Sequence, residues 1–154
     1  MNFSLPNMPT TQRVWMAADH AGFKLKEALK RNLVRDGRAV ADLTPVFQAG
    51  DDYPLIGKKM AAAVLAHGQP GILLCGTGAG MDIIANRFRG IRAVVARTPQ
   101  EARLAREHNH ANILVLGARL TSARQAGAIV QAWLTTPYGR AARHVRRVRE
   151  LDQV

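Results

Sequence analysis

Short apolar segments alternate with longer amphipathic segments along most of this chain. The apolar segments run for four to six residues with little polar alternation, which is typical of strands buried on both faces. They lie at residues 14–18, 39–43, 72–75, 91–96 and 113–116. The segments between them repeat apolar residues every three or four positions and predict helices. These helices are expected at 23–35, from Pro54 to the break at Gly68 and Pro70, at 81–86, at 99–108, from Thr121 or Ser122 to 134, and at 140–151.

Several helix ends carry recognisable signals. Leu25, Leu29 and Leu33 share one face of the helix at 23–35, and Gly37 ends that helix. Residues 98–101 read Thr-Pro-Gln-Glu, which predicts a capping box with proline in the first helical position. These signals indicate helices of ordinary length between the strands.

Buried strands that alternate with helices predict an α/β protein. We expect a three-layer α/β/α, Rossmann-like fold with a five-stranded parallel sheet covered on both faces. Ligands of such sheets bind beyond the carboxyl ends of the strands. That edge would gather Asp19 with His20, residues 75–80, Arg97 and residues 117–119.

Composition is that of a single-domain globular protein. The chain has 154 residues, of which 47% are hydrophobic and 21% charged. Residues 1–12 are polar and lack the apolar core of a signal peptide, so we expect a flexible leader before one domain over 13–151 that ends in a basic helix. No apolar run in the sequence approaches the roughly 20 residues of a membrane span. The single cysteine excludes an internal disulfide and favours a cytoplasmic protein.

The chain is strongly basic, with a formal net charge of +11 from 22 Lys and Arg against 11 Asp and Glu. Such a balance favours an anionic partner: a phosphorylated metabolite, nucleic acid or an anionic membrane. Arg143 and Arg147 are four positions apart and would share a helical face able to grip one phosphate, although a solvated basic face has the same pattern. With four Phe and two Tyr, the chain lacks the interleaved aromatic residues of a surface that binds single-stranded nucleic acid.

The strongest chemical signal is the run Gly-Ile-Leu-Leu-Cys-Gly-Thr-Gly-Ala-Gly at 71–80. A buried strand ends there in the only cysteine, and a glycine-rich turn leads into the next helix. Glycines let successive N–H groups turn inward, so the loop can hold an anion or a developing oxyanion beside the Cys75 thiol. The spacing matches neither the dinucleotide fingerprint nor a Walker loop. The alternative is that Cys75 is only a small buried hydrophobe.

The other polar candidates also have structural interpretations. Asp19 and His20 follow a strand and could cap the next helix. His108 and Asn109 end a helix, where His and Asn often serve as C-caps. No second cluster in the sequence completes a tetrahedral ligand set around the histidines, so we expect no metal.

Together these motifs resemble type B ribose-5-phosphate isomerase, in a family that also includes the allose-6-phosphate and galactose-6-phosphate isomerases. The resemblance covers nearly the whole of 14–148. It rests on Ala-Asp-His-Ala-Gly-Phe-Lys-Leu-Lys at 18–26, Asp-Tyr-Pro at 52–54, the run at 71–80, Ala-Asn-Arg at 85–87, Gly-Ile-Arg-Ala at 90–93, Glu-His-Asn at 107–109, Asn-Ile-Leu-Val-Leu-Gly-Ala-Arg at 112–119 and Arg-His-Val-Arg-Arg-Val at 143–148.

The resemblance implies a metal-free aldose–ketose isomerase that needs no cofactor and works through a cis-enediolate. Cys75 corresponds to the base that moves a proton between carbon one and carbon two of the open-chain sugar. Some relatives use a glutamate just after the glycine loop, where this chain has Met81, so Cys75 would carry the role. Thr77 and the N–H groups of the loop would stabilise the enediolate oxygen. His108 corresponds to the residue that opens the furanose ring.

The resemblance also implies how the substrate is held. Asp19 and Asn109 would bind sugar hydroxyls or oxygens. The other implied binding residues are His20, Arg119, Arg143 and Arg147 for the phosphate, and Tyr53, Gly76, Gly78, Ala79 and Gly80 around the sugar. In the family the site lies between two subunits, with the His-Asn segment reaching in from the neighbour. A homodimer or a dimer of dimers is therefore implied, with no nucleic-acid or membrane partner.

Two features depart from the family pattern. The family usually reads His-Asn-Asp where this chain has His108-Asn109-His110, and the loop at 44–51 is not closely matched to the ribose enzymes. Both lie where they could affect the choice of sugar. The main prediction is interconversion of ribose 5-phosphate and ribulose 5-phosphate through an enediolate. The alternatives are a six-carbon substrate, allose 6-phosphate or galactose 6-phosphate, and, more remotely, a non-catalytic nucleic-acid-binding protein.

Overall fold

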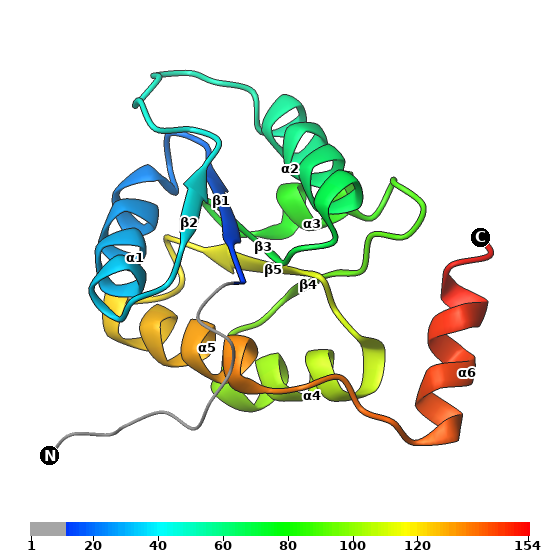
Figure 1. Cartoon of the computed structure of the whole chain (residues 1–154). Coiled ribbons are helices and arrows are strands. Elements are labelled where there is room, and N and C mark those ends of the chain that lie inside the picture. Colours follow the sequence, from blue (N-terminus) through cyan, green and yellow to red (C-terminus); the bar gives the residue numbers. More distant parts are fainter. Residues whose placement is uncertain (1–11) are drawn as a thin grey trace, which may run out of the picture.

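Five parallel strands form one sheet in the order β2-β1-β3-β5-β4 in the computed structural model, which describes residues 12–154 (Figure 1). The strands are β1 Val14–Ala18, β2 Val40–Asp42, β3 Gly71–Cys75, β4 Ala93–Val95 and β5 Ile113–Gly117. The parallel five-stranded sheet expected from the sequence is confirmed. The predicted leader lies outside the described residues except for Gln12.

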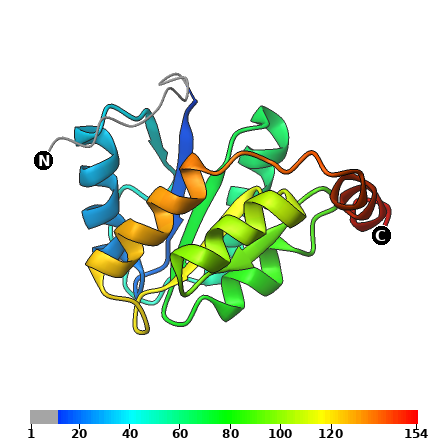
Figure 2. The same cartoon turned by 90° about the horizontal axis from the view of Figure 1, so that it is seen from below.

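Helices cover both faces of the sheet and complete the three expected layers. They are α1 Phe23–Arg35, α2 Tyr53–His67, α3 Ala79–Ala85, α4 Pro99–Asn109, α5 Ala123–Thr135 and α6 Ala142–Leu151. One core cluster joins the sheet to α1 and α5 through Leu29 and Trp133, and a second joins it to α2 and α3 through Met60 and Met81. Helix α6 stands out from these layers and packs on α4 (Figures 1 and 2). Within residues 12–154 no helix is both long and apolar enough to cross a membrane.

Some element boundaries differ from the predictions. Strand β4 is shorter than the expected 91–96, because Arg92 makes loop contacts: its N–H donates to Asn112 Oδ1 (2.8 Å) and its Nε to the His110 carbonyl (3.1 Å). Helix α3 begins two residues before the expected 81, since Gly78 at φ 87° turns the chain directly into it. Helix α6 begins at Ala142 rather than at 140.

The capping box predicted at 98–101 forms only in part. The Thr98 hydroxyl accepts the N–H of Glu101 at 3.1 Å, as expected. The Glu101 carboxylate, however, accepts the N–H of Arg97 (2.6 Å) instead of that of Thr98. A complete box forms at α5, where Ser122 and Gln125 satisfy each other's backbone N–H groups.

A buried lysine ties α1 to the end of β2. Lys26 is fully buried, and its ammonium donates to Asp42, to Glu27 (2.8 Å) and to the carbonyl of Thr44 (2.8 Å). The Thr44 hydroxyl in turn accepts the N–H of Ala18 at 3.0 Å, one residue before Asp19. The network therefore holds the loop after β2 against the carboxyl end of β1, where the site residues begin.

Replacing Asp42 by asparagine is expected to lower the free energy of unfolding by about 2 kcal/mol at pH 7. Removing one partner of a buried pair costs about 3–5 kcal/mol, and Glu27 remains here to compensate part of the Lys26 charge. Burial raises the pKa of Asp42, but hydrogen bonds from Lys26 and Lys30 outweigh burial and hold that pKa below its usual value.

The lowered pKa gives this contribution a defined pH dependence. It is fully present above the unfolded-state pKa of about 3.9 and is lost as the pH falls through the lower native value. Urea unfolding at pH 7 and pH 3 should therefore show a large difference between parent and Asp42→Asn at pH 7 and a smaller one at pH 3. Asp36→Asn, which removes an exposed carboxylate 3.5 Å from Arg35, is the control and should change little. An equal difference in the free energy of unfolding between parent and Asp42→Asn at both pH values would contradict a stabilising role of the ionised Asp42 carboxylate.

Candidate active site

Residues from the carboxyl ends of β1, β3 and β5 meet at one edge of the sheet and line a cavity of about 200 Å³. This is the edge that the strand order predicts for a ligand site. The lining residues are Asp19, His20, Ala21, Tyr53, Cys75, Gly76, Thr77, Gly80 and Arg119. Eight of them were singled out from the sequence, and the structure brings these together.

Cys75 is the last residue of β3 and is 5% exposed. Its sulfur accepts the N–H of Gly78 at 3.1 Å, a contact that the positive φ of Gly78 makes possible. An N–H donor directed at sulfur stabilises negative charge there. The thiol is therefore buried, lies at the cavity wall and has a built-in donor for its anionic form.

The glycines of the loop let neighbouring side chains approach closely. A Cβ on Gly80 would lie 2.6 Å from the Tyr53 ring, and one on Gly76 would lie 3.2 Å from the guanidinium carbon of Arg119. The N–H of Arg119 also donates to the Gly76 carbonyl at 2.9 Å. Tyr53 and Arg119 are thus placed against the glycine loop, and a side chain at Gly80 would displace the Tyr53 ring.

Asp19 contributes to both local structure and the cavity wall. It is 6% exposed, and its Oδ1 accepts the N–H of Gly22 (2.9 Å), the residue that precedes α1. Gly22 itself packs on β3, with a would-be Cβ 2.6 Å from the Leu74 carbonyl carbon. Asp19 therefore does not cap α1, whose N-cap is Gly22, but it holds the residue from which the helix begins.

His20 has a partner that the sequence analysis missed. Both its backbone N–H and its ring Nδ1 lie 2.8 Å from Oδ1 of Asp51, in the loop before α2. The two residues are 31 positions apart, and no spacing rule connects them. The only signal was that Asp51 adjoins the Asp-Tyr-Pro motif at 52–54.

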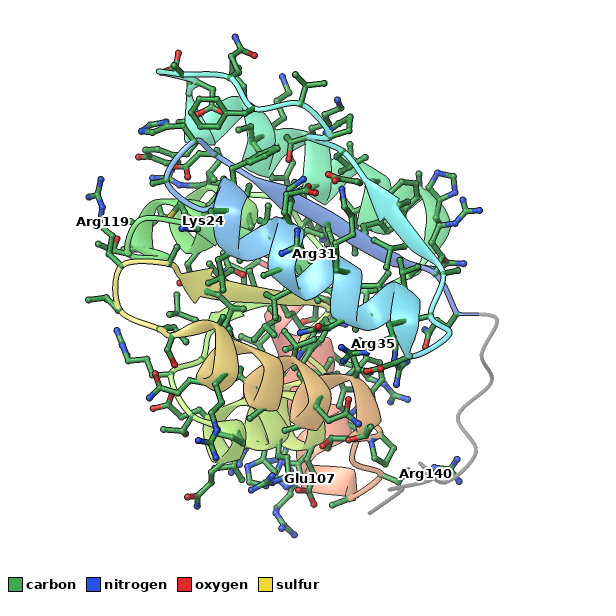
Figure 3. The ribbon with its side chains drawn as sticks, turned by 90° about the vertical axis from the view of Figure 1, so that its left-hand side faces the viewer. Lys24, Arg31, Arg35, Glu107, Arg119 and Arg140 are labelled. Carbon is green, nitrogen blue, oxygen red and sulfur yellow. The ribbon has the colours of Figure 1, made fainter. Side chains whose placement is uncertain are left out.

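Four of the remaining predicted residues form a second cluster at the other edge of the sheet. Helix α4 leaves the carboxyl end of β4 and leads to the amino end of β5, so its last residues, His108 and Asn109, lie opposite the Cys75 cavity. Figure 3 labels Arg119 and Glu107, which precedes His108, at well-separated places on the molecule. Arg143 and Arg147 lie one turn apart on α6, which packs on α4.

An imidazole stack joins α4 to α6. The rings of His108 and His144 are nearly parallel (5°), with centroids 4.3 Å apart. Burial, followed by the positive charges of His108, Arg143 and Arg147, lowers the pKa of His144. The lowered pKa favours the neutral form of the His144 ring that stacks on His108. The arginines of α6 are therefore held in the same cluster as His108.

His110 stands where the family usually has aspartate, and it has a structural role. It caps α4 in the left-handed conformation (φ 49°), which Asn, Asp and His adopt more readily than other side chains. Its ring stacks on Tyr138 with centroids 4.6 Å apart, and its Nε2 lies 2.7 Å from the Gly139 carbonyl. Arg106 lies over the same Tyr138 ring. These contacts fix the segment that leads to α6.

Among residues 12–154 no group of three or more His, Cys, Asp or Glu side chains is arranged to hold a metal ion.

Arg97, which the sequence placed at the carboxyl edge of the sheet, follows β4 and is not among the residues that line the cavity. The predicted binding residues Gly78 and Ala79, at the start of α3, are also not among the residues that line the cavity.

The chain is similar in sequence and fold to known sugar-phosphate isomerases. The family model described as Ribose/Galactose Isomerase matches residues 14–151. Ribose-5-phosphate isomerase B of Mycobacterium tuberculosis is 41% identical over 138 residues, 88% of this chain and 85% of that one. The Escherichia coli protein of that name is 40% identical over 145 residues, 93% and 96% of the two chains.

Solved structures agree with the sequence relatives. A crystal structure of a ribose 5-phosphate isomerase from Thermotoga maritima superposes with a TM-score of 0.89 at 47% identity, over 94% of this chain and 99% of that one. Ribose-5-phosphate isomerase B from Mycoplasma genitalium with bound ribulose-5-phosphate has a TM-score of 0.87 at 33% identity, over 93% and 95%.

Proposed function

Because this chain belongs to the ribose/galactose isomerase family, as its motifs indicated, we propose that it interconverts ribose 5-phosphate and ribulose 5-phosphate. The observation that carries the proposal is the cavity that places Cys75 beside a glycine loop and Arg119, in a chain about 40% identical to ribose-5-phosphate isomerases B. A relative of 33% identity holds ribulose-5-phosphate in its structure. No observation on this chain favours a six-carbon sugar or nucleic acid.

Cys75 is the proposed base. Its thiolate removes the proton from carbon two of the open-chain aldose, which gives an enediolate with its charge on the carbon-one oxygen. The hydroxyl proton of carbon two then moves to the carbon-one oxygen, and the thiol returns its proton to carbon one to give the ketose. Every atom and electron stays within the substrate and the thiol, so the reaction needs no cofactor. Met81 is fully buried, and it supplies no carboxylate for an alternative base.

An enediolate requires donors fixed beside the base. The Thr77 hydroxyl and the N–H groups of the Gly76–Gly80 loop other than that of Gly78, which donates to the Cys75 sulfur, are the proposed donors, since the first N–H groups of a helix have no partner within that helix. Asp19 and Tyr53 line the same cavity and would contact the sugar. The developing charge therefore forms where backbone donors are already in place.

Two clusters in one chain require two chains in the working enzyme. The His108 cluster lies across the sheet from Cys75, so one chain cannot bring both to one substrate. We propose a homodimer or dimer of dimers in which His108 and Asn109 of a neighbouring subunit complete the Cys75 cavity. There His108 opens the furanose ring, Asn109 binds sugar oxygens, and Arg143 and Arg147 join His20 and Arg119 on the phosphate.

Exposed apolar side chains beside the cavity support such a contact. Leu55, in the first turn of α2, and Ile83, in the second half of α3, are 68% and 61% exposed. They lie near an open hollow lined by Tyr53, Pro54 and Ile84. A second subunit would cover this surface. We further propose that the enzyme works in the cytoplasm, where the Cys75 thiol stays reduced.

The proposed substrate is tested by assaying ribose, allose and galactose phosphates side by side. Ribose 5-phosphate should show the highest kcat/KM, by about tenfold or more, because one extra carbon in a fitted pocket typically costs 10- to 200-fold. A chelator should leave the rate unchanged. Faster turnover of a hexose phosphate would reassign the substrate, and no turnover of any of the three would overturn the proposal.

A further inference from the structure

The contact between His20 and Asp51 determines which ring nitrogen of His20 carries hydrogen. Asp51 Oδ1 lies 2.8 Å from Nδ1 and also accepts the backbone N–H of the same residue. An ionised carboxylate only accepts, so Nδ1 must be the donor. The Asp51 side chain is 14% exposed and that of His20 is 43% exposed. Asp51 thus lies behind the ring, and Nε2 is the ring nitrogen left for a ligand.

The chemistry of imidazole then restricts what Nε2 can do. In the neutral ring with hydrogen on Nδ1, Nε2 carries a lone pair and repels a phosphate oxygen. Only the imidazolium donates through both nitrogens at once. An ionised Asp51 stabilises that cation through a charge-assisted hydrogen bond. The positive charge of Arg119 and the negative charge of Asp19, both in the cavity wall, act on the ring as well.

We propose that Asp51 is a positioning residue that makes His20 a cationic Nε2–H donor to the substrate phosphate. The inference rests on the proposed function, in which His20 contacts that phosphate. It leads to a result that simple electrostatics would not give: a carboxylate beside an anion site strengthens binding of the anion.

The start of the loop that carries Asp51 is fixed to the core. The Thr44 hydroxyl accepts the N–H of Ala18 (3.0 Å), and Lys59 donates to the Leu43 carbonyl at 3.1 Å. Both contacts join the start of the loop to elements of the core. This is the loop, at 44–51, that is not closely matched to the ribose enzymes in sequence.

Asp51→Asn is the decisive variant, because the amide oxygen can still accept from Nδ1 while the charge is gone. We expect the inhibition constant of inorganic phosphate and the KM for ribose 5-phosphate to rise together by about five- to tenfold, since charge-assisted hydrogen bonds are about twice as strong as neutral ones. The value of kcat should stay within about twofold, because in the proposal His20 contacts the phosphate and not the carbons between which the proton moves.

Asp52→Asn is the matched control. It removes the same charge from the next residue, which is exposed and makes no side-chain cap bond to α2. Phosphate affinity should be unchanged or slightly tighter in this variant. Equal weakening by both variants, or tighter binding in Asp51→Asn, would overturn the proposal.

Two further measurements separate this inference from the proposed function. Nitrogen-15 NMR of the parent should show hydrogen on Nδ1 of neutral His20, and Asp51→Ala should abolish that preference; hydrogen on Nε2 in the parent would overturn the inference without any variant. His20→Ala and Arg143→Ala should both weaken phosphate binding. If they do and Asp51→Asn does not, only the role of Asp51 is wrong. If neither does, the proposed phosphate site itself is wrong.

Discussion

Replacing Cys75 by alanine is expected to abolish isomerisation while the protein still folds and binds the phosphorylated sugar. Loss of a general base typically costs 10²- to 10⁴-fold in rate. The structure offers no substitute base at the position where some relatives carry a glutamate, because Met81 there is apolar and fully buried. The nearby Asp82 has its carboxylate bonded by Asn86 at 3.2 Å, and burial raises the pKa of Asp82.

The measurement compares turnover with binding in the same preparation. Calorimetry with ribose 5-phosphate should give an affinity close to that of the parent, and the thermal midpoint should fall only slightly, because a thiol is replaced by a smaller apolar group. Cys75→Ser keeps an acceptor for the Gly78 N–H but has no readily ionised proton, so it should be nearly as inactive. Met81→Leu is the volume-conserving control in the same core and should remain active. Turnover above about a tenth of the parent value in Cys75→Ala would rule out the cysteine as base.

The fold could be predicted from the sequence because its signals are local. Helix α1 has the expected bounds, since Leu25, Leu29 and Leu33 are buried in one stripe and Gly37 follows at φ 80°. The errors occurred where tertiary contacts override local preference. Gly80 has a low helix propensity, yet it lies in the first turn of α3 because the Tyr53 ring occupies the space of a side chain.

The predictions of the site residues succeeded where a general rule applied and failed where tertiary contacts decide the geometry. The rule that ligands bind at the carboxyl ends of parallel strands brought Asp19, Cys75 and Arg119 together correctly. The same rule could not include His108, because a helix that leads to the next strand ends at the opposite edge. The pairing of His20 with Asp51 was also out of reach, since it depends on the path of an irregular loop. Motifs gave the candidate residues, and the topology divides them into two clusters.

His108 should be needed for the cyclic substrate and much less for the open-chain ketose. Ribulose 5-phosphate cannot close into a furanose, because its carbon-five oxygen is phosphorylated. His108→Asn should therefore slow conversion of aldose to ketose by about 10²-fold, the low end of the range for general acid–base catalysis. Exchange of solvent deuterium at the carbon beside the ketone needs only Cys75 and the oxyanion donors, so it should stay within about tenfold of the parent. In His108→Asn, the His144 ring loses the imidazole that stacks on it at 4.3 Å, but the neutral asparagine adds no charge beside His144.

Deuterium exchange into ribulose 5-phosphate, followed by NMR, separates ring opening from proton transfer in the same sample. His67→Asn is the matched control, because His67 stacks on Trp15 at the end of α2 and has no part in either cluster. It should leave both rates unchanged.

The two-chain arrangement adds a further expectation: a mixture of His108→Asn and Cys75→Ala subunits should regain activity, since each mixed dimer contains one cavity with both native residues. If His108→Asn lost deuterium exchange as completely as Cys75→Ala, His108 would not be confined to ring opening. If the mixture regained no activity after the formation of mixed dimers was verified, ring opening and proton transfer would not be divided between two chains.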